Sequence, residues 1–210
     1  MATRVHLVRH GEVHNPGHVV YAGLPGFSLS RAGTEQARAV ARYLGRQPVV
    51  AVWASPLERA LRTAEAVAGR LGMAVRVDPR LAEWQLMDRW AGVAWDDLPE
   101  KHPGELEAFL AHPASLEFAP ESLVELGGRM AASIRELESE YPHGDVVVVS
   151  HSAPLRAATL VVTGAPLDDF WDHRPGHGAV TTLRPGSTWK VETIWEPDQT
   201  DPDPTEPDPT

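Results

Sequence analysis

The sequence contains no cysteine, no long apolar run and no excess of positive charge. Without cysteine, disulfides and thiolate chemistry are excluded, and a reducing compartment is permitted. The early apolar stretch is interrupted by His6, Arg9 and His10, and no segment approaches the roughly 18 consecutive apolar residues of a membrane-spanning helix. We therefore expect a cytoplasmic protein that is neither exported nor embedded in a membrane.

The net charge of −10 is concentrated at the C-terminal end. Residues 196–210 hold six acidic residues and no lysine or arginine, which leaves −4 for the rest of the chain. A mildly acidic body has no broad basic face for nucleic acid, although a local cluster of arginines can still bind phosphate. Because the same segment has five prolines and few apolar residues, we expect a disordered tail after a single domain at 1–195.

Strand-like and helix-like patterns alternate along the chain. Residues 145–150 (DVVVVS) form the clearest buried strand, and residues 3–9 and 49–54 also have strand character. Further strands are expected at 74–77, 179–184 and 190–195, and helices at 31–45, 121–140 and 153–163. Strands separated by helices predict an α/β fold whose sheet is mainly parallel in its early part.

The segment Ser55-Pro56-Leu57-Glu58 is typical of a helix start. Serine is a preferred N-cap, proline suits the first helical position, and a glutamate three residues after the cap completes a capping box. We therefore predict a helix over 56–71, directly after the strand at 49–54.

Three cationic or nucleophilic positions fall at the carboxyl ends of predicted strands: Arg9 with His10, Arg59 in the first turn after the strand at 49–54, and His151 after the strand at 145–150. In parallel α/β sheets such strand ends gather at one edge, where ligands bind. The forked donors of arginine match phosphoryl oxygens, and a neutral imidazole can attack phosphorus. The pattern predicts phosphoryl-transfer chemistry.

These residues lie within blocks that resemble the histidine phosphatase superfamily, also called the phosphoglycerate mutase-like family. The blocks are LVRHGE at 7–12, LSRAGTEQA at 29–37, ASPLERALRTAEAV at 54–67, RLAE at 80–83 and VVVVSHSAPLRA at 146–157. They follow the family's order and cover most of residues 3–185. The resemblance implies a phosphoglycerate mutase-like three-layer sandwich, with helices flanking a central, mainly parallel sheet.

The resemblance also implies a role for each site residue. His10 becomes phosphorylated, Arg9, Arg59 and His151 hold the transferring phosphoryl group, and Glu83 is the general acid for the leaving oxygen. It implies no metal and no other cofactor. Without Mg²⁺, charge on the phosphoryl oxygens has to be neutralised by cationic side chains and amides, which agrees with these roles.

Asn15 is a candidate substrate-binding residue, because an asparagine close to this point contributes to the phosphate pocket in the family. A simple turn residue is the other interpretation. The chain departs from the family at Val13, where many members have threonine, and at Ser152 and Ala153, where many have two glycines; the latter change narrows the space beside His151. Arg156 matches a common family arginine, with a helix-surface charge as the alternative.

Other polar side chains have competing interpretations. Surface charges or alternative acids near Glu83 are Glu58, Asp88, Asp96 and Asp97. Histidines that we expect at the surface or in packing, with the pocket entrance as the alternative, are His14, His18, His173 and His177. Histidines at 6, 10, 14 and 18 have the spacing of a metal-binding helical face, but Pro16 and Gly17 argue against a helix there. For most of the tryptophans, core and lid packing is favoured over a sugar-stacking or apolar substrate pocket.

The favoured function is a metal-independent phosphatase that hydrolyses a small phosphorylated metabolite through a phosphohistidine intermediate. A mutase is the alternative within the family, but the short stretch at 84–120 leaves little material to enclose an intermediate. A phosphate-binding protein with little catalysis has no need of Glu83, and a metal-dependent hydrolase is the remaining class. We expect no nucleic-acid or membrane partner, and a homodimer stays open.

Overall fold

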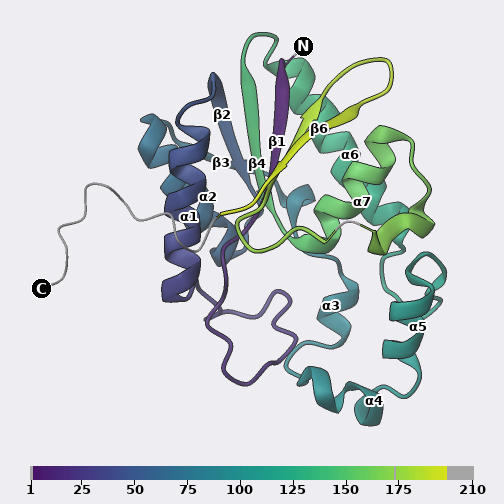
Figure 1. Ribbon diagram of the computed structural model, residues 1–210. Helices are drawn as coiled ribbons and strands as arrows, with labels where there is room; N and C mark the ends of the chain where they lie inside the picture. The colour runs from purple at the N-terminus through teal and green to yellow at the C-terminus, as the bar shows by residue number, and fades with distance from the viewer. Residues whose placement is uncertain (1, 173, 198–210) are drawn as a thin grey trace, which may run out of the picture.

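The computed structural model describes residues 2–172 and 174–197 and contains one six-stranded sheet in this part of the chain (Figure 1). The strands are β1 (Arg4–Arg9), β2 (Val49–Ala54), β3 (Val75–Val77), β4 (Asp145–Ser150), β5 (Val180–Arg184) and β6 (Lys190–Trp195). Their order is β3-β2-β4-β1-β5-β6. Strands β1 to β4 pair in parallel, whereas β5 is antiparallel to both β1 and β6. The sheet is therefore mixed, and its early part is parallel as predicted.

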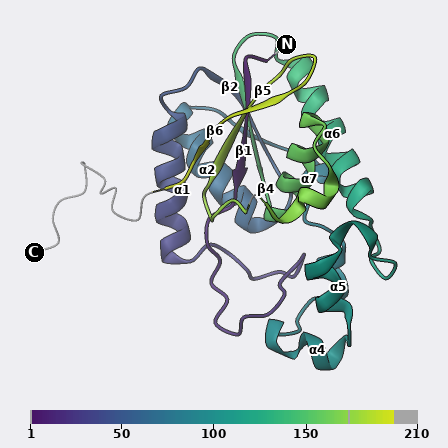
Figure 2. The ribbon, with the colours of Figure 1, turned by 45° about the vertical axis from the view of Figure 1, so that its right-hand side comes forward.

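Helices cover both faces of this sheet. Helices α1 (Arg31–Leu44) and α2 (Glu58–Leu71) lie on one face, and α6 (Leu123–Glu140) and α7 (Ser152–Thr163) lie on the other (Figures 1 and 2). The shorter helices are α3 (Leu86–Arg89), α4 (Leu98–Lys101) and α5 (Glu105–Ala111), with 3₁₀ helices η1 (Pro79–Leu81), η2 (Trp95–Asp97), η3 (Pro113–Ser115) and η4 (Leu167–Trp171). The three-layer α/β arrangement is confirmed.

Strand β4 shows why the sheet is central, because every one of its residues is buried. Val147 and Val149 pack with side chains of α1 and α2, whereas Val146 and Val148 pack with side chains of α6 and α7. Successive side chains of a strand point to opposite faces, so an uninterrupted valine run supplies both cores. Full burial of each such side chain stabilises the fold by roughly 1.5–3 kcal/mol.

The predicted start of the second helix is wrong by two residues. Helix α2 begins at Glu58, its N-cap is Leu57, and no side chain caps it. The Ser55 hydroxyl accepts a weak bond from the Leu57 amide (3.3 Å) but also contacts His151 Nε2 at 2.8 Å. The Ser55 hydroxyl group, which the local pattern assigned to helix capping, is thus engaged by the distant His151. The capping box instead occurs on α6, between Ser122 and Glu125.

The carboxyl ends of β1, β2 and β4 meet at one edge of the sheet, where Arg9 pairs with Ser150 and Ala54 with Val149. The loop at 11–30 descends from this edge towards the short helices (Figure 1). The start of this loop lies directly against α1 at Gly11 and Gly33. A Cβ on Gly33 would lie 2.0 Å from the Glu12 carbonyl oxygen, and one on Gly11 would lie 2.3 Å from the Gly33 carbonyl oxygen, so no larger residue fits at either position. The loop and the short helices thereby extend the structure beyond the strand ends.

The predicted tail is described only as far as residue 197, and the rest of it lies outside the described residues. Within the part of the chain that the structure describes, none of the helices has the length and apolar character needed to cross a membrane.

Candidate active site

The structure brings five of the predicted site residues together at the edge where the strands end: Arg9, His10, Arg59, Glu83 and His151. Three of them show how the strand ends position the site. His10 directly follows β1, Arg59 lies in the first turn of α2, and His151 stands between β4 and α7. All three are buried, with exposed fractions of 2%, 1% and 0%. The rings of His10 and His151 are 5.2 Å apart, and Glu83 Oε2 lies 3.8 Å from His151 Nδ1.

The His10 ring presents one nitrogen that is not protonated. Its Nδ1 lies 2.7 Å from the carbonyl oxygen of Gly11, and because a carbonyl can only accept, Nδ1 carries the hydrogen. The other nitrogen, Nε2, accepts a long 3.3 Å bond from Arg59 Nε. Burial, reinforced by the Arg59 charge, holds the pKa of His10 well below its usual value. At neutral pH the ring is therefore neutral, with a lone pair on Nε2 that can act as a nucleophile.

Three buried donors around His10 have no hydrogen-bond partner in the part of the chain that the structure describes: Arg9 Nε, Arg59 Nη2 and His151 Nδ1. The Ser55 hydroxyl accepts from Leu57 and can donate to His151 Nε2, an arrangement that leaves the hydrogen on Nδ1. A buried donor without a partner costs free energy unless a ligand accepts from it. The arrangement is suited to an anion with several acceptor oxygens.

Glu83 is the carboxyl group beside these cations. Its Oε2 is 3.9 Å from Arg59 Nη2, too far for a hydrogen bond, and its Oε1 accepts from the Trp84 amide at 2.9 Å. Burial raises the pKa of Glu83, and Arg59 offsets only part of that effect. A carboxyl group with a raised pKa can hold a proton and deliver it.

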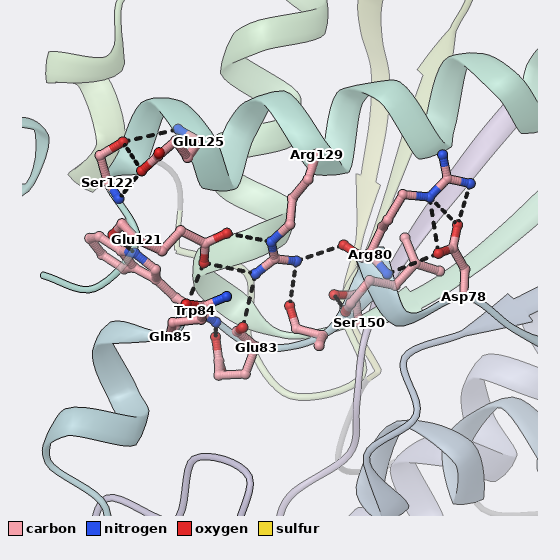
Figure 3. Close-up of polar contacts among 12 residues, drawn as sticks. Asp78, Arg80, Glu83, Trp84, Gln85, Glu121, Ser122, Glu125, Arg129 and Ser150 are labelled. Carbon is pink, nitrogen blue, oxygen red and sulfur yellow. Dashed lines mark hydrogen bonds and ion pairs between the residues drawn. The ribbon is translucent and has the colours of Figure 1, made fainter.

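Arg129, on α6, positions the backbone that carries Glu83 (Figure 3). Its guanidinium donates to the carbonyl oxygens of Arg80 (2.6 Å), Ala82 (2.9 Å) and Glu83 (2.9 Å), and it pairs with the carboxylate of Glu121. Nothing in the local sequence singled out Arg129, because the carbonyl oxygens that it contacts lie 46 to 49 residues away.

Arg9 is held by the segment that precedes β5. Its Nη1 donates to the Pro175 carbonyl oxygen at 2.9 Å, and its Nη2 lies 2.8 Å from His177 Nε2. The His177 ring is 5.7 Å from the His10 ring, and burial together with Arg9 lowers the pKa of His177 to about 4. His177 therefore belongs to the site. This agrees with the alternative interpretation, a histidine at the pocket entrance, and not with the expected position at the surface or in packing.

The remaining candidates lie elsewhere. Both ends of the Asn15 amide bond the backbone of Val19, at 2.9 and 3.1 Å, and so close the loop at 15–19; its role in phosphate binding stays a prediction. His14 and His18 are exposed, whereas His173 lies outside the described residues. Tyr21, which no pattern indicated, lies under the Arg59 guanidinium at 4.7 Å.

A cavity of about 360 Å³ adjoins the site, and its polar lining includes Arg9, Glu83 and His177. Its apolar lining consists of Val19, Val20, Ala22, Met87, Trp95, Phe109, Leu110, Ala153, Phe170 and Trp171. Arg156 also lines it and is only 7% exposed, so the interpretation of that arginine as a helix-surface charge is wrong. The cavity is large enough for a small organic molecule.

Among residues 2–172 and 174–197, no three His, Asp or Glu side chains are grouped so as to hold a metal ion. His6, part of the spacing considered above, instead bonds Asp145 and Thr182.

A family model described as "Histidine phosphatase superfamily (branch 1)" matches residues 5–195. Phosphoserine phosphatase 1 of Hydrogenobacter thermophilus is 31% identical over 166 residues, which cover 79% of this chain and 78% of that protein. Glucosyl-3-phosphoglycerate phosphatase of Mycobacterium tuberculosis is 30% identical over an alignment of 216 positions, which covers 92% of this chain and 94% of that protein.

The solved structures include a mycobacterial glucosyl-3-phosphoglycerate phosphatase with a TM-score of 0.82 and 26% identity. The superposition covers 94% of this chain and 100% of that one. The fold, the matched blocks and the relatives agree that the chain belongs to the histidine phosphatase superfamily and is a phosphatase.

Proposed function

We propose that this phosphatase hydrolyses the phosphomonoester of a small metabolite in two steps, through a phosphohistidine on His10. The observation that carries the proposal is that Arg9, Arg59 and His151, the residues around His10, each keep a buried donor without a partner among the described residues, beside an unprotonated Nε2 of His10 that accepts only a long bond from Arg59. A phosphoryl group presents oxygens to such donors while its phosphorus faces the nitrogen.

In the first step the lone pair of His10 Nε2 forms a bond to phosphorus as the ester O–P bond breaks. Arg9 and Arg59 neutralise charge on the phosphoryl oxygens in the transition state, and the neutral His151 ring donates a hydrogen bond to them from Nδ1. The departing oxygen takes the proton of the Glu83 carboxyl group and leaves as an alcohol. Glu83 becomes a carboxylate beside the Arg59 charge, which stabilises it.

In the second step a water oxygen attacks phosphorus, and the N–P bond breaks. The Glu83 carboxylate accepts the proton of that water, so inorganic phosphate is released and both His10 and Glu83 return to their starting states. The raised pKa of Glu83 supports both the donation and the later uptake of a proton.

The names of two relatives support the proposed size and class of the substrate. These two proteins are named for the hydrolysis of phosphoserine and of glucosyl-3-phosphoglycerate, which are small phosphorylated metabolites. We infer a substrate of this class, without a metal or another cofactor, because the cationic side chains of the site can supply the charge that a metal would provide.

Trapping of the intermediate tests the proposal. Brief incubation with para-nitrophenyl phosphate radiolabelled on phosphorus, followed by a quench in alkali, should leave label on the wild type that is released by acid, as expected of an N–P bond. His10→Ala should take up none, whereas His14→Ala, at an exposed histidine, should label like the wild type. Turnover should also continue at an unchanged rate in excess EDTA.

Equal labelling of His10→Ala and wild type would overturn the nucleophile assignment. Label that passes to an added acceptor substrate instead of to water would show a mutase. Binding of phosphate without label or turnover would show a binding protein, and loss of turnover in EDTA would show a metal-dependent hydrolase.

A further inference from the structure

Arg156 is a buried cation in the cavity wall that the two steps above do not use. Its side chain comes from α7 and is 93% buried, since the exposed fraction is 7%. The guanidinium carbon lies 3.9 Å from the centre of the Phe170 ring and 4.4 Å from that of Trp171. These ring contacts hold the guanidinium plane in a defined orientation at the cavity.

The guanidinium has only one hydrogen bond among the described residues, from Nη2 to the Phe170 carbonyl oxygen. Nε is buried and has no partner. No Asp or Glu of residues 2–172 and 174–197 lies within ion-pair distance of Arg156. A buried cation without a counter-ion is costly unless a bound anion completes it.

The charge of Arg156 supports a second anion in the cavity. Burial, with the charges of Arg174 and Arg9, lowers the pKa of Arg156 to about 10, so the side chain is still positively charged at neutral pH. The proposed mechanism matches Arg9 and Arg59 with the phosphoryl group. That assignment leaves Arg156 without an anion in the same cavity.

We propose that Arg156 binds a carboxylate on the leaving half of the substrate, so that the preferred substrates are phosphomonoesters of hydroxy-carboxylic acids. The planar fork of a guanidinium matches a planar carboxylate through charge-assisted bonds. The carbon skeleton between the two anions would lie against apolar lining such as Val20, Phe109 and Trp171. This inference rests on the proposed phosphatase function and deepens it.

A structural role is the competing explanation, because Arg156 also ties α7 to the Phe170 carbonyl oxygen of η4. The two explanations differ in what they predict for substrates without a carboxylate. A purely structural arginine would affect all substrates alike, whereas a carboxylate-binding arginine affects only those that carry the second anion.

The experiment compares kcat/KM within two matched pairs of different length: 3-phosphoglycerate with glycerol 3-phosphate, and para-carboxyphenyl phosphate with phenyl phosphate. Wild type should prefer the carboxylate in at least one pair by about 10- to 100-fold, the range expected for a hydrogen bond to a charged group. Arg156→Met should abolish that preference and leave the partner without the carboxylate within about 3-fold. Arg156→Lys should keep part of the preference, because it keeps the charge but loses the fork.

Arg174→Met is the matched control. Arg174 is exposed, also lies on the Trp171 ring at 4.6 Å, and is not part of the cavity lining, so its loss should leave the preference unchanged. The ratio within one preparation does not depend on the folded fraction, so partial misfolding of a variant does not obscure the result.

Two results would overturn the inference while leaving the phosphatase intact: a wild type that hydrolyses both members of both pairs equally, or an Arg156→Met variant that loses both members equally. Failure of the proposed function looks different, because the wild type would then hydrolyse none of the four compounds or para-nitrophenyl phosphate.

Discussion

Two buried histidines, His6 within β1 and His10 directly after it, occupy opposite kinds of surroundings. His6 is 1% exposed and His10 is 2% exposed. Both ring nitrogens of His6 have side-chain partners at 3.0 Å, the Asp145 carboxylate and the Thr182 hydroxyl. His10 bonds one backbone carbonyl and otherwise faces arginine. The two rings are thus equally buried but have different partners. His6 contacts a carboxylate and a hydroxyl group, whereas His10 contacts a carbonyl oxygen and a cationic guanidinium.

Burial alone does not identify the reactive histidine, because it lowers the pKa of His6 as well as that of His10. The position of the nearest carboxyl group distinguishes the reactive histidine from the structural one. Asp145 is directly bonded to His6, whereas Glu83 stays 3.8 Å from His151 and 3.9 Å from Arg59. In this protein the Asp145 carboxylate, bonded to His6, supports the fold, whereas the Glu83 carboxyl group makes no hydrogen bond to Arg59 or His151 and can hold a proton for chemistry.

The largest expected effect beyond loss of the nucleophile itself comes from Glu83→Gln. Hydrolysis of an alkyl phosphate should fall by about 10²- to 10⁴-fold, because the alkoxide needs a proton, whereas para-nitrophenyl phosphate should lose less than about 10-fold. The raised pKa means that the acid form persists to higher pH than for an ordinary glutamate and is lost as pH rises through that pKa. The alkaline fall of kcat for alkyl substrates should therefore disappear in the variant. Equal losses on both substrates would assign the acid to another residue.

His6→Leu should destabilise the fold by about 3 kcal/mol, because it leaves the buried Asp145 carboxylate without its partner. Urea unfolding measures this free energy. The kcat of the folded fraction should stay near wild type, in contrast to the inactive His10→Ala, and His14→Leu at an exposed position should change stability by less than about 0.5 kcal/mol. A loss of kcat in His6→Leu comparable to that of His10→Ala would break the comparison between the two histidines.

Features encoded in contiguous sequence could be predicted. The apolar runs located the strands, and the strand ends placed Arg9, His10, Arg59 and His151 at one edge of the sheet, as the structure has them. The same reasoning failed at Ser55. The local pattern predicts that Ser55 caps a helix, but its hydroxyl group contacts His151, 96 residues away. A local rule cannot anticipate a partner that only the folded sheet supplies.

The contacts that support the site could not be predicted for the same reason, although a place at the pocket entrance was an alternative for His177. Arg129 reaches backbone carbonyls 46 to 49 residues away, and His177 meets Arg9 across 168 residues. Neither lies in a recognisable motif, and their effect depends on long-range geometry. The strand ends, by contrast, meet because parallel pairing brings them together whatever their side chains are.

His177 offers the smallest and sharpest test, because it is half-buried and its ring contacts Arg9 directly. His177→Leu removes the acceptor of Arg9 Nη2 and should lower kcat/KM by about 5- to 10-fold, mainly through KM. His177→Gln offers an amide oxygen in the same role and should recover most of the loss. If Leu and Gln behave alike, Arg9 is positioned without His177.

The same residue has a pH signature in stability. Because the folded protein holds the pKa of His177 near about 4 while an unfolded histidine titrates near its usual 6.5, the unfolded chain binds the proton first. Stability due to this group is present above about pH 6.5 and is lost as pH falls towards about 4. Allowing for its partial exposure, wild type should lose about 1 kcal/mol more than His177→Gln over that interval in urea unfolding. Parallel curves for the two proteins would mean that folding does not lower the pKa of His177, and that its ring nitrogen does not accept a hydrogen bond from Arg9 in the folded protein. His177 would then resemble His6, a histidine whose burial gives it no role in the reaction.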